Sequence, residues 1–342
     1  MISVQPVDRS RERDLRALID AKAKPLGALG RIEDLAVRLA LIEGRPNPRC
    51  ERALLMVFAG DHGLNEAGVS AYPSAVTAAM VATLLAGRAS ANAFARAIGA
   101  EVKVVDAGVS VDLAPHPSLI DAKVRKGTRN AELGPALTET EVELALGRGA
   151  AMARQALEED GFDILAVGEM GIGNSASAAL VLHRLAPAPL EDCIGAGAGH
   201  DAEGMTRKAA VLARAAERTD ASAPLEVLAE FGGLEIAMMA GAILGAGAAG
   251  RPVVVDGFIA STAALAAIRL QPSVADYCIF AHRSVEKGHD LALAAAGAAP
   301  LLDLSMRLGE GTGALLAIPL IRAAAALLTD VASLDDVLAG RL

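Results

Sequence analysis

The chain alternates between two kinds of segment, and this alternation constrains its fold more than any other feature. Short apolar runs rich in β-branched residues end abruptly at a glycine or a charged residue, and longer stretches of alanine and leucine with helical spacing follow them. Such alternation predicts βαβ units and a mainly parallel sheet. The predicted strands span residues 53–59, 102–105, 163–167, 252–255, 277–280 and 299–302.

Apolar residues fill nearly every position of these runs, which is typical of strands whose two faces are both covered by helices. We therefore predict an α/β protein with a three-layer α/β/α body. The helices expected around the sheet span residues 74–98, 139–159, 174–185, 201–217, 234–244, 261–270 and 312–328.

Both ends of the chain differ from this body. Residues 10–21 and 31–43 are helix-like segments on either side of KPLGALG (24–30), and the chain from residue 312 onward is helical too. The simplest organisation is a large α/β domain of residues 45–311 and a small helical domain built from residues 1–44 plus 312–342.

The composition narrows the class of protein. With 342 residues, 53% hydrophobic residues and only 21% charged residues, the chain can bury a sizeable core, which excludes disorder as its main state. Aromatic residues make up 2% and tryptophan is absent, so the core has to be aliphatic. The net charge of −9 argues against nucleic-acid binding but leaves room for a small anionic ligand at a local positive site.

Three features indicate a cytoplasmic protein. The cysteines Cys50, Cys193 and Cys278 are scattered and form no CxxC pair, as expected in a reducing compartment. Charged residues occur within the first ten positions, unlike in a secretory signal. The uncharged, strongly apolar run of residues 236–250 is shorter than the roughly 20 residues that span a bilayer. We therefore expect a buried helix there and no membrane association.

Polar residues follow the predicted strands at the points where the strands end. In a parallel sheet these turns meet at the carboxyl edge, where open α/β sheets bind their ligands, so their convergence predicts a functional pocket. The turns are FAGDHG (58–63), VVDAGV (104–109), VGEMGIGN (167–174), VVDGF (254–258), FAHRS (280–284) and RLGEGTG (307–313).

The turn at residues 168–174 is the best candidate for a phosphate loop. Gly171 and Gly173 allow backbone N–H groups to approach an anion, and Asn174 and Ser175 can begin a helix whose amino end favours negative charge. An ordinary tight strand-to-helix turn explains the same glycines equally well. No Gly-Lys-Ser/Thr follows, so the turn is not a P-loop.

A second glycine-rich turn, GAGAGHD (195–201), resembles half of a dinucleotide-binding fingerprint but lacks the GxGxxG spacing. Lys208 follows it on a predicted helix. A lone helical lysine is most often solvated; the alternative is that it supplies the positive group that an anionic substrate requires.

The segment RLGEGTG is the most unusual stretch, because glycines flank Glu310 on both sides and disfavour a helix. Such an acid lies in a turn where the backbone can pack around a ligand, or else is an exposed loop acid. The histidines near the turns show no metal-binding spacing such as HExxH, so we expect no metal site. These histidines are His62, His200, His282 and His289.

Taken together, these motifs resemble the nicotinate-nucleotide–dimethylbenzimidazole phosphoribosyltransferase family, which makes α-ribazole phosphate for the lower ligand of cobalamin. The matching blocks run in family order along nearly the whole chain. They are KPLGALGRIEDLA (24–36), GDHGLNEAGVSAYPSAVT (60–77), VVDAGV (104–109), GEMGIGNSASAA (168–179), GAGAG (195–199), GGLEIAMMAGA (232–242), DGFIAS (256–261), AHRSVEKGH (281–289) and PLLDLSMRLGEGTGA (300–314).

The resemblance implies a soluble homodimer with a Rossmann-like body and a helical small domain. The Ala/Gly-rich stretch 234–245 suits close helix packing, which we also take to favour a dimer. The implied reaction moves phosphoribosyl from nicotinate mononucleotide to 5,6-dimethylbenzimidazole and needs no metal or organic cofactor. The nicotinate ring nitrogen is already cationic when bound to ribose, so nicotinate leaves without an added acid, and attack from the opposite face turns a β-linkage into an α-linkage.

The resemblance also implies roles for individual residues. Glu310 is expected to be the general base that takes the proton of the attacking benzimidazole, and Glu169 is expected to support the ribose cation electrostatically. The expected phosphate- and nucleotide-binding residues are Gly171, Gly173, Asn174, Ser175, Lys208, Ser284 and Asp256. Tyr72 and Met80 are expected in the base pocket, at positions where some relatives carry small or amide side chains, so the preferred base stays open.

Some blocks depart from the usual family pattern. The common GIGNTT is GIGNSAS here, so Ser175 keeps a hydroxyl that Ala176 lacks, and GAGTG and KPxGSLG appear as GAGAG and KPLGALG. These losses affect fine phosphate contacts rather than the reaction. Two alternatives stay open: a non-catalytic nucleotide-binding or sensor protein on the same fold, against which the intact Glu310 and Glu169 argue, and a Rossmann oxidoreductase suggested by GAGAG.

Overall fold

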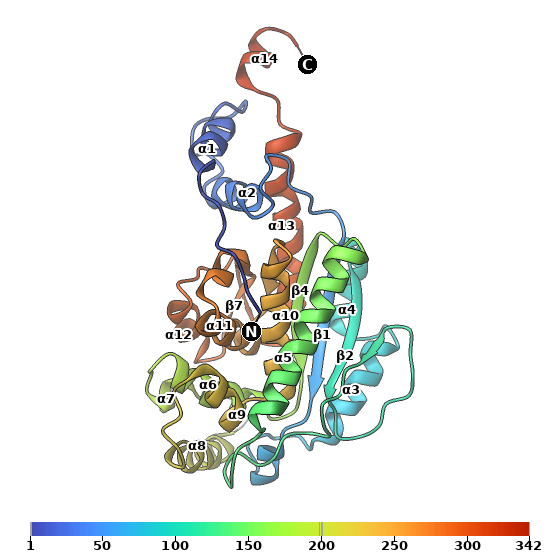
Figure 1. Cartoon of the computed structure of the whole chain (residues 1–342), viewed down its shortest axis with the longest axis vertical. Coiled ribbons are helices and arrows are strands. Elements are labelled where there is room, and N and C mark those ends of the chain that lie inside the picture. The colour runs from blue at the N-terminus through green and yellow to red at the C-terminus, as the bar shows by residue number, and fades with distance from the viewer. Residues whose placement is uncertain (1, 198, 200, 342) are drawn as a thin grey trace.

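The computed structural model describes residues 2–197, 199 and 201–341 (Figure 1). Its centre is a parallel sheet of six strands: β1 (Ala53–Gly60), β2 (Glu101–Gly108), β3 (Leu119–Asp121), β4 (Ile164–Met170), β5 (Val253–Val255) and β6 (Cys278–Phe280). The strand order is β3–β2–β1–β4–β5–β6, which is that of a Rossmann fold. The reversal of order between β1 and β4 is where ligands bind in such sheets.

Helices cover both faces of the sheet. On one face lie α5 (Glu139–Arg154), α6 (Asn174–Leu185), α9 (Pro224–Phe231), α10 (Leu234–Ala248) and α11 (Phe258–Leu270), and on the other lie α2 (Arg31–Ile42), α4 (Ser90–Ile98) and α13 (Thr312–Thr329). Successive residues of a strand point to opposite faces, so Leu54 and Met56 fill the first core while Leu55 and Val57 fill the second. The predicted three-layer α/β/α architecture is confirmed.

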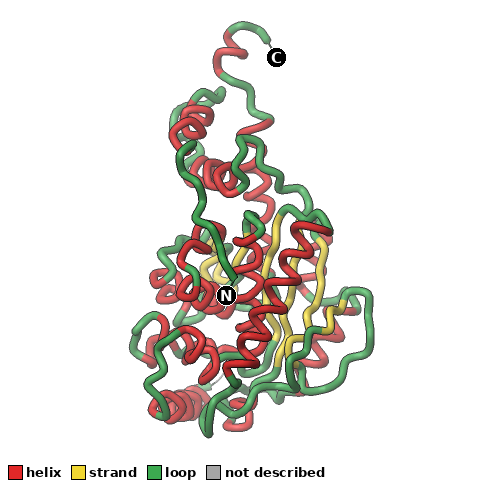
Figure 2. The backbone as a smooth tube through the Cα atoms, viewed as in Figure 1, coloured by secondary structure: helices red, strands yellow, loops and turns green. Residues whose placement is uncertain are grey.

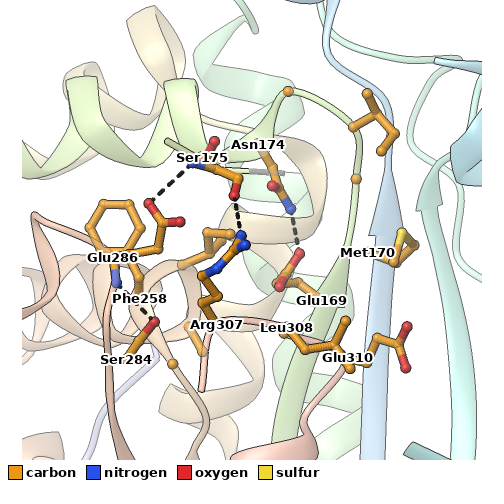
Figure 3. A pocket seen from close by; sticks show the side chains of 18 of the residues that line it. Glu169, Met170, Asn174, Ser175, Phe258, Ser284, Glu286, Arg307, Leu308 and Glu310 are labelled. Atoms are coloured by element: carbon orange, nitrogen blue, oxygen red, sulfur yellow. Dashed lines mark hydrogen bonds between the residues drawn. The ribbon is translucent and has the colours of Figure 1, made fainter. Parts of the chain in front are cut away.

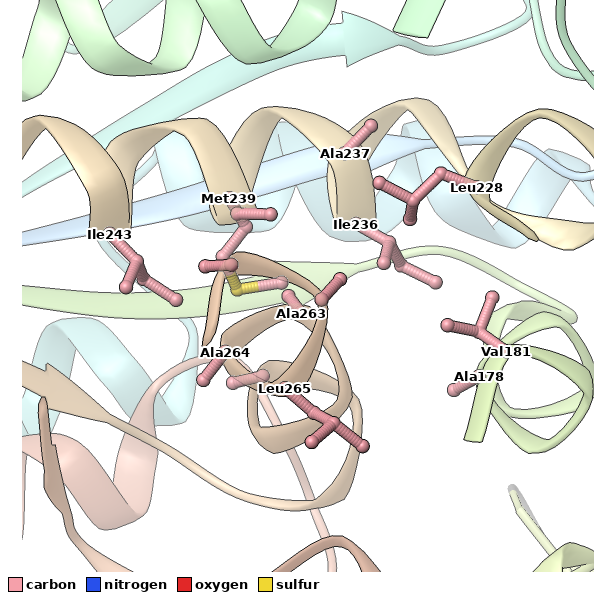
Figure 4. Close-up of a cluster of buried hydrophobic side chains, with 14 of the residues drawn as sticks. Ala178, Val181, Leu228, Ile236, Ala237, Met239, Ile243, Ala263, Ala264 and Leu265 are labelled. Atoms are coloured by element: carbon pink, nitrogen blue, oxygen red, sulfur yellow. The ribbon is translucent and has the colours of Figure 1, made fainter. Parts of the chain in front are cut away.

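The buried helix α10 shows how a core with few aromatic residues is packed. Figure 4 shows it against α11 through Ile236, Met239 and Ala263. On its other side, a Cβ atom at Gly241 or Gly245 would lie 2.1 or 2.5 Å from a carbonyl oxygen of α5, so glycine permits close contact of the two backbones. The small residues of this stretch therefore pack within the chain, and our use of them as an indication of a dimer was wrong.

Two predicted boundaries are wrong. The helix predicted over 74–98 is broken into α3 (Ala75–Leu85) and α4, because Gly87 has a left-handed backbone (φ +71°) that ends the first helix. The strand predicted over 299–302 is instead β8 (Leu302–Met306), which pairs with β7 (His282–Ser284) in a separate two-stranded sheet. Leu301 and Leu302 donate hydrogen bonds to the carbonyls of Phe280 and Ala281, at and just after the end of β6. The segment that begins β8 therefore pairs with the chain beyond β6, outside the main sheet.

Further elements complete the described chain. Several short elements, including β3 and β7, were not indicated by the sequence pattern. The remaining elements are α1 (Glu12–Asp20), the 3₁₀ turn η1 (Gly63–Ala67), the π-helical turn η2 (Gln155–Glu159), α7 (Leu190–Cys193), α8 (Ala202–Glu217), the 3₁₀ turn η3 (Pro272–Tyr277), α12 (His289–Ala295) and α14 (Leu334–Leu338).

The two ends of the chain meet. Helices α1 and α2 lie beside the carboxyl-terminal half of α13, at the end of the molecule away from the carboxyl edge of the sheet (Figures 1 and 2). The buried Lys22 links them, because its Nζ donates to the carbonyls of Leu328 and Val331, both at 2.7 Å. The exact division into domains of residues 45–311 and 1–44 plus 312–342 stays a prediction.

Helix α13 is the one helix of the described chain whose length and composition alone would allow it to cross a membrane. Its packing explains its apolar character in another way, because 61% of it is buried inside the protein. It also carries Arg322, whose guanidinium donates to the carbonyls of Cys50, Glu51 and Ile98. These contacts are those of a helix in a protein core.

Candidate functional site

A cavity of about 430 Å³ opens at the carboxyl edge of the sheet (Figure 3). The turns that follow β4, β5 and β8 line it, together with β7, α3 and the segment between η1 and α3. The structure thus brings the predicted turns together around one space. The predicted site residues that line the cavity are Tyr72, Met80, Glu169, Gly171, Gly173, Asn174, Ser175, Asp256, Ser284 and Glu310.

The turn from β4 into α6 requires glycine for two reasons. A Cβ atom at Gly171 would lie 2.4 Å from the carbonyl oxygen of Gly60, and Gly173 has a left-handed backbone with φ of +93°. Helix α6 begins directly afterwards at Asn174, so its positive amino end faces the cavity. This is the geometry in which a helix terminus binds a phosphate group.

Lys208 is the one predicted site residue outside the lining, and it lies directly behind Ser175. Its side chain is fully buried, and Nζ donates to Ser175 Oγ at 3.0 Å and to the carbonyl oxygen of Gly195 at 2.9 Å. Burial lowers the pKa of Lys208 to about 8, against a weak opposing effect of Glu286. The solvated-lysine alternative is therefore wrong. The ammonium group lies next to Ser175, which lines the cavity, and can stabilise an anion bound there.

The second glycine-rich turn closes over the same end of the cavity. Gly197 N donates to Glu286 Oε2 at 3.3 Å, and the carbonyl oxygen of Gly197 accepts from Arg307 Nη1 at 3.2 Å. The turn follows helix α7 rather than a strand, so it lacks the context of a dinucleotide-binding fingerprint. Ala198 and His200 of this turn lie outside the described residues.

Glu169 is a buried acid at the end of β4. Asn174 Nδ2 donates a hydrogen bond to its carboxylate, and its backbone carbonyl accepts from Glu310 N at 3.3 Å. Burial raises the pKa of Glu169 to about 8, Asn174 opposes this, and the neighbouring carboxylates Asp256, Glu235 and Glu310 add to it. The protein alone therefore holds Glu169 mostly protonated at neutral pH, and a cation beside it would favour ionisation.

Glu310 is held in a strained backbone conformation. Gly309, Glu310 and Gly311 have φ values of +86°, +59° and +78°, three left-handed residues in succession. A Cβ atom at Gly309 would lie 2.3 Å from Glu169 Oε1, and one at Gly311 would lie 2.3 Å from a methyl carbon of Leu55. The flanking glycines are thus required by conformation and by space, and strain of this kind is characteristic of functional sites.

The Glu310 carboxylate is buried rather than an exposed loop acid, so that alternative is wrong. Ala91 N, in the first turn of α4, donates to Glu310 Oε2 at 3.4 Å. Burial raises the pKa of Glu310 above its ordinary value, and the bond from Ala91 opposes the shift. A carboxylate with a raised pKa is a stronger proton acceptor than one in water.

Asp256 fixes the loop that carries Glu310. Its Oδ2 accepts from Gly311 N at 3.2 Å and its Oδ1 from Ala314 N at 2.9 Å, so it holds the start of α13. Burial raises the pKa of Asp256, while the nearby His282 lowers it. Asp256 therefore has a structural role in the site, in addition to the nucleotide contact predicted for it.

Ser284 is oriented by a buried chain of hydrogen bonds that sequence reasoning missed. Ser284 N donates to His289 Nδ1 at 2.7 Å, so the ring proton is on Nε2, which donates to Ser261 Oγ at 3.0 Å. Burial lowers the pKa of His289 to about 4, which keeps the ring neutral. Among the described residues, no group of three or more His, Cys, Asp or Glu side chains could hold a metal ion.

One wall of the cavity is apolar and suits a flat aromatic ring. Tyr72, just before α3, and Met80, on α3, contribute to it. The other contributors are Met170 at the end of β4, Phe258 at the start of α11 and Leu308 in the turn after β8. Met170, Phe258 and Leu308 were not predicted from the sequence, because only the polar residues beside them were taken as candidates for the site. The apolar wall lies in the same cavity as the Glu310 carboxylate.

A helix terminus backed by a buried lysine at one end, and carboxylates beside an apolar wall at the other, suit a nucleotide with its phosphate at the first end and its glycosidic bond at the second. The class that this fold and site define is a transferase acting on a phosphoribosyl group. A family model described as phosphoribosyltransferase matches residues 4–337. The chain belongs to the nicotinate-nucleotide–dimethylbenzimidazole phosphoribosyltransferase family.

Curated relatives and solved structures match over nearly the whole chain. Proteins with that family name from Cupriavidus necator and Ralstonia nicotianae are 50% and 52% identical, over 96% and 93% of this chain and 95% and 91% of their own. The crystal structure of CobT from Thermus thermophilus is 44% identical, with a TM-score of 0.92, over 95% of this chain and 98% of that one. The resemblance stated from the motifs is thus confirmed.

Proposed function

We propose that this protein transfers phosphoribosyl from nicotinate mononucleotide to 5,6-dimethylbenzimidazole, releasing nicotinate and forming α-ribazole 5'-phosphate for the lower ligand of cobalamin. The observation that carries the proposal is the 50% identity to enzymes of that name over almost the whole chain. The cavity supports it, because Glu310 lies intact in a buried turn next to an apolar wall.

In the proposed mechanism, the phosphate binds at the amino end of α6, on the backbone of Gly171, Gly173 and Asn174. Lys208, acting through Ser175, and Ser284 complete this end of the site. The ammonium of Lys208 has only neutral hydrogen-bond partners in the described chain, so a phosphate would supply the missing negative charge. Fixing the phosphate places the ribose C1' between the carboxylates and the apolar wall.

The chemical step needs one base and no added acid. A benzimidazole nitrogen attacks C1' from the face opposite to nicotinate, and the C1'–N bond breaks with its electron pair going to the pyridine nitrogen, which becomes neutral. Glu310 takes the proton from the other benzimidazole nitrogen as that nitrogen becomes acidic. The cationic ring of the bound nucleotide favours loss of the Glu169 proton to solvent before the chemical step, and the resulting carboxylate then stabilises the positive charge as it moves from the ring to the ribose.

A nicotinate-release assay tests this function against the two alternatives. We expect release of nicotinate only when the protein, nicotinate mononucleotide and a benzimidazole are all present, and a panel of benzimidazoles, purines and phenols then defines the preferred base. Binding of the nucleotide without release would indicate a sensor protein. Binding of NAD, measured by calorimetry, would favour an oxidoreductase.

We also propose that the protein is a cytoplasmic homodimer. The support is the family membership together with exposed leucines on the helical end of the molecule, where Leu26 and Leu338 are 76% and 77% exposed. Light scattering at micromolar concentration tests this directly. A monomer would contradict the proposal.

A further inference from the structure

The cavity contains a buried histidine that the proposed mechanism does not use. His282 lies on β7, where it and Ser284 point inward while Arg283 between them is exposed. Its side chain is 2% exposed and lines the cavity; Nδ1 is buried without a hydrogen-bond partner within the described chain, and Nε2 lies 3.9 Å from Asp256 Oδ1. Buried polar groups in folded proteins are nearly always paired, so an unpaired imidazole beside a cavity indicates a ligand group.

The Asp256 carboxylate is an acceptor close to this ring. His282 Nε2 lies 3.9 Å from Asp256 Oδ1, which is too far for a hydrogen bond. A hydroxyl oxygen placed about 2.8 Å from both atoms would bridge them, because it can accept from Nε2–H and donate to the carboxylate.

The surrounding glycines hold the ring next to this carboxylate. A Cβ atom at Gly257 would lie 3.0 Å from His282 Nε2, and one at Gly313 would lie 2.0 Å from His282 Cδ2. The ring is therefore packed between two backbone segments that carry no side chain at the point of contact. One of these segments follows Asp256 directly, and the other begins α13, which Asp256 holds through Gly311 and Ala314.

The chemistry of this pair fits a neutral hydroxyl better than the other groups of the nucleotide. A phosphate would lie against the Asp256 carboxylate, and the cationic Lys208 stands with Ser175 in another part of the site. An aromatic ring would offer neither an acceptor to the imidazole N–H nor a donor to the carboxylate. A sugar hydroxyl both donates and accepts, which is what a carboxylate and an imidazole N–H together require.

We propose that His282 and Asp256 bind one of the two ribose hydroxyls of the nucleotide and thereby orient the sugar for attack at C1'. This inference rests on the proposed function and adds to it a subsite that discriminates ribose from deoxyribose. Asp256 then holds both the sugar and the loop of Glu310, so the position of the sugar is tied to that of the Glu310 carboxylate.

The test compares nicotinate mononucleotide with its 2'-deoxy and 3'-deoxy analogues in the wild-type protein and in His282→Leu and His282→Gln. In the wild type, we expect the loss of the bound hydroxyl to lower kcat/KM about 10- to 100-fold relative to loss of the other hydroxyl. In His282→Leu this difference should fall to roughly threefold or less. The amide of His282→Gln can still donate and should restore part of it.

Comparing ratios between variants cancels the intrinsic effect of each hydroxyl on the reactivity of C1'. Equal ratios in the wild type and in His282→Leu would overturn the inference. If the wild type released no nicotinate from the ribonucleotide itself, the proposed function would fail instead. His116→Asn, outside the cavity, is the control for loss of an imidazole. If His282→Leu does not fold, His282→Asn, too short to reach the hydroxyl, replaces it under the same criteria.

Discussion

The two ends of the cavity carry ionisable groups of opposite kinds, acids at one end and a lysine at the other, and burial disfavours the charged form of each in the protein alone. At one end, burial raises the pKa values of Glu169 and Glu310, and at the other it lowers the pKa of Lys208. A substrate with a cationic ring and an anionic phosphate reverses both penalties at once. The comparison teaches that each end of the cavity is stabilised by the part of the nucleotide with the opposite charge. The phosphate end should therefore govern nucleotide binding and KM, and the carboxylate end should govern the chemical step and kcat.

The largest expected effect is at the carboxylate end. Glu310→Gln keeps the size of the side chain and one acceptor but cannot readily take the proton, so kcat should fall by about 10²–10⁴. Nucleotide binding and thermal stability should change little, and the exposed Glu217→Gln is the matched control. A nearly wild-type rate at neutral pH with dimethylbenzimidazole would remove Glu310 from the mechanism and leave Glu169 as the next candidate.

At the phosphate end, Lys208→Met fills similar space without the charge. We expect the KM for nicotinate mononucleotide to rise about 10- to 100-fold, the value of a charge-assisted hydrogen bond, with a smaller effect on kcat. Lys126→Met removes an exposed lysine paired with Asp112 and should change neither constant. A fall in kcat at unchanged KM would show that the two ends are not separate in function.

A smaller effect at the same end comes from the backbone. Gly173→Val forces a β-branched residue into a left-handed conformation, with its Cβ 3.3 Å from that of Asn65, so the start of α6 has to shift. We expect KM for the nucleotide to rise on the order of tenfold while circular dichroism shows the fold intact. An unchanged KM would argue that the phosphate binds elsewhere.

The smallest expected effect concerns stability against pH. Folding raises the pKa of Glu169 from 4.5 to about 8, so the stability this group provides is present below pH 4.5 and is lost as pH rises through about 8. The melting temperature of the ligand-free protein should therefore fall by a few degrees between pH 6 and 8.5, and Glu169→Gln should lessen this fall. An identical pH dependence in the variant would contradict a protonated Glu169 in the ligand-free protein.

The sequence allowed the fold class and much of the candidate site to be predicted, because both depend on local patterns. Strand ends and glycine-rich turns occur within a few residues of each other, and a parallel sheet gathers them at one edge. The break of the helix predicted over 74–98 was harder to see, since Gly87 disfavours a helix only modestly compared with the apolar pattern around it.

What could not be predicted depends on contacts between distant segments. Three features join residues that no local pattern links. They are the hydrogen bond between Lys208 and Ser175, the hydrogen bonds of Gly197 with Glu286 and Arg307, and the second sheet of β7 and β8. His282 was visible in the sequence as a histidine after a strand. Its unpaired ring became informative only once its neighbours were known.

The left-handed run at residues 309–311 has a consequence for how the specificity of such a protein can change over time. Gly309 touches Glu169 and Gly311 touches Leu55 in the sheet, so hardly any substitution there leaves the acid loop in place. Tyr72, which lines the same cavity, is 49% exposed and has no such close packing. Substitution at Tyr72 can therefore change the accepted base while the acid loop, and with it the chemistry, stays fixed.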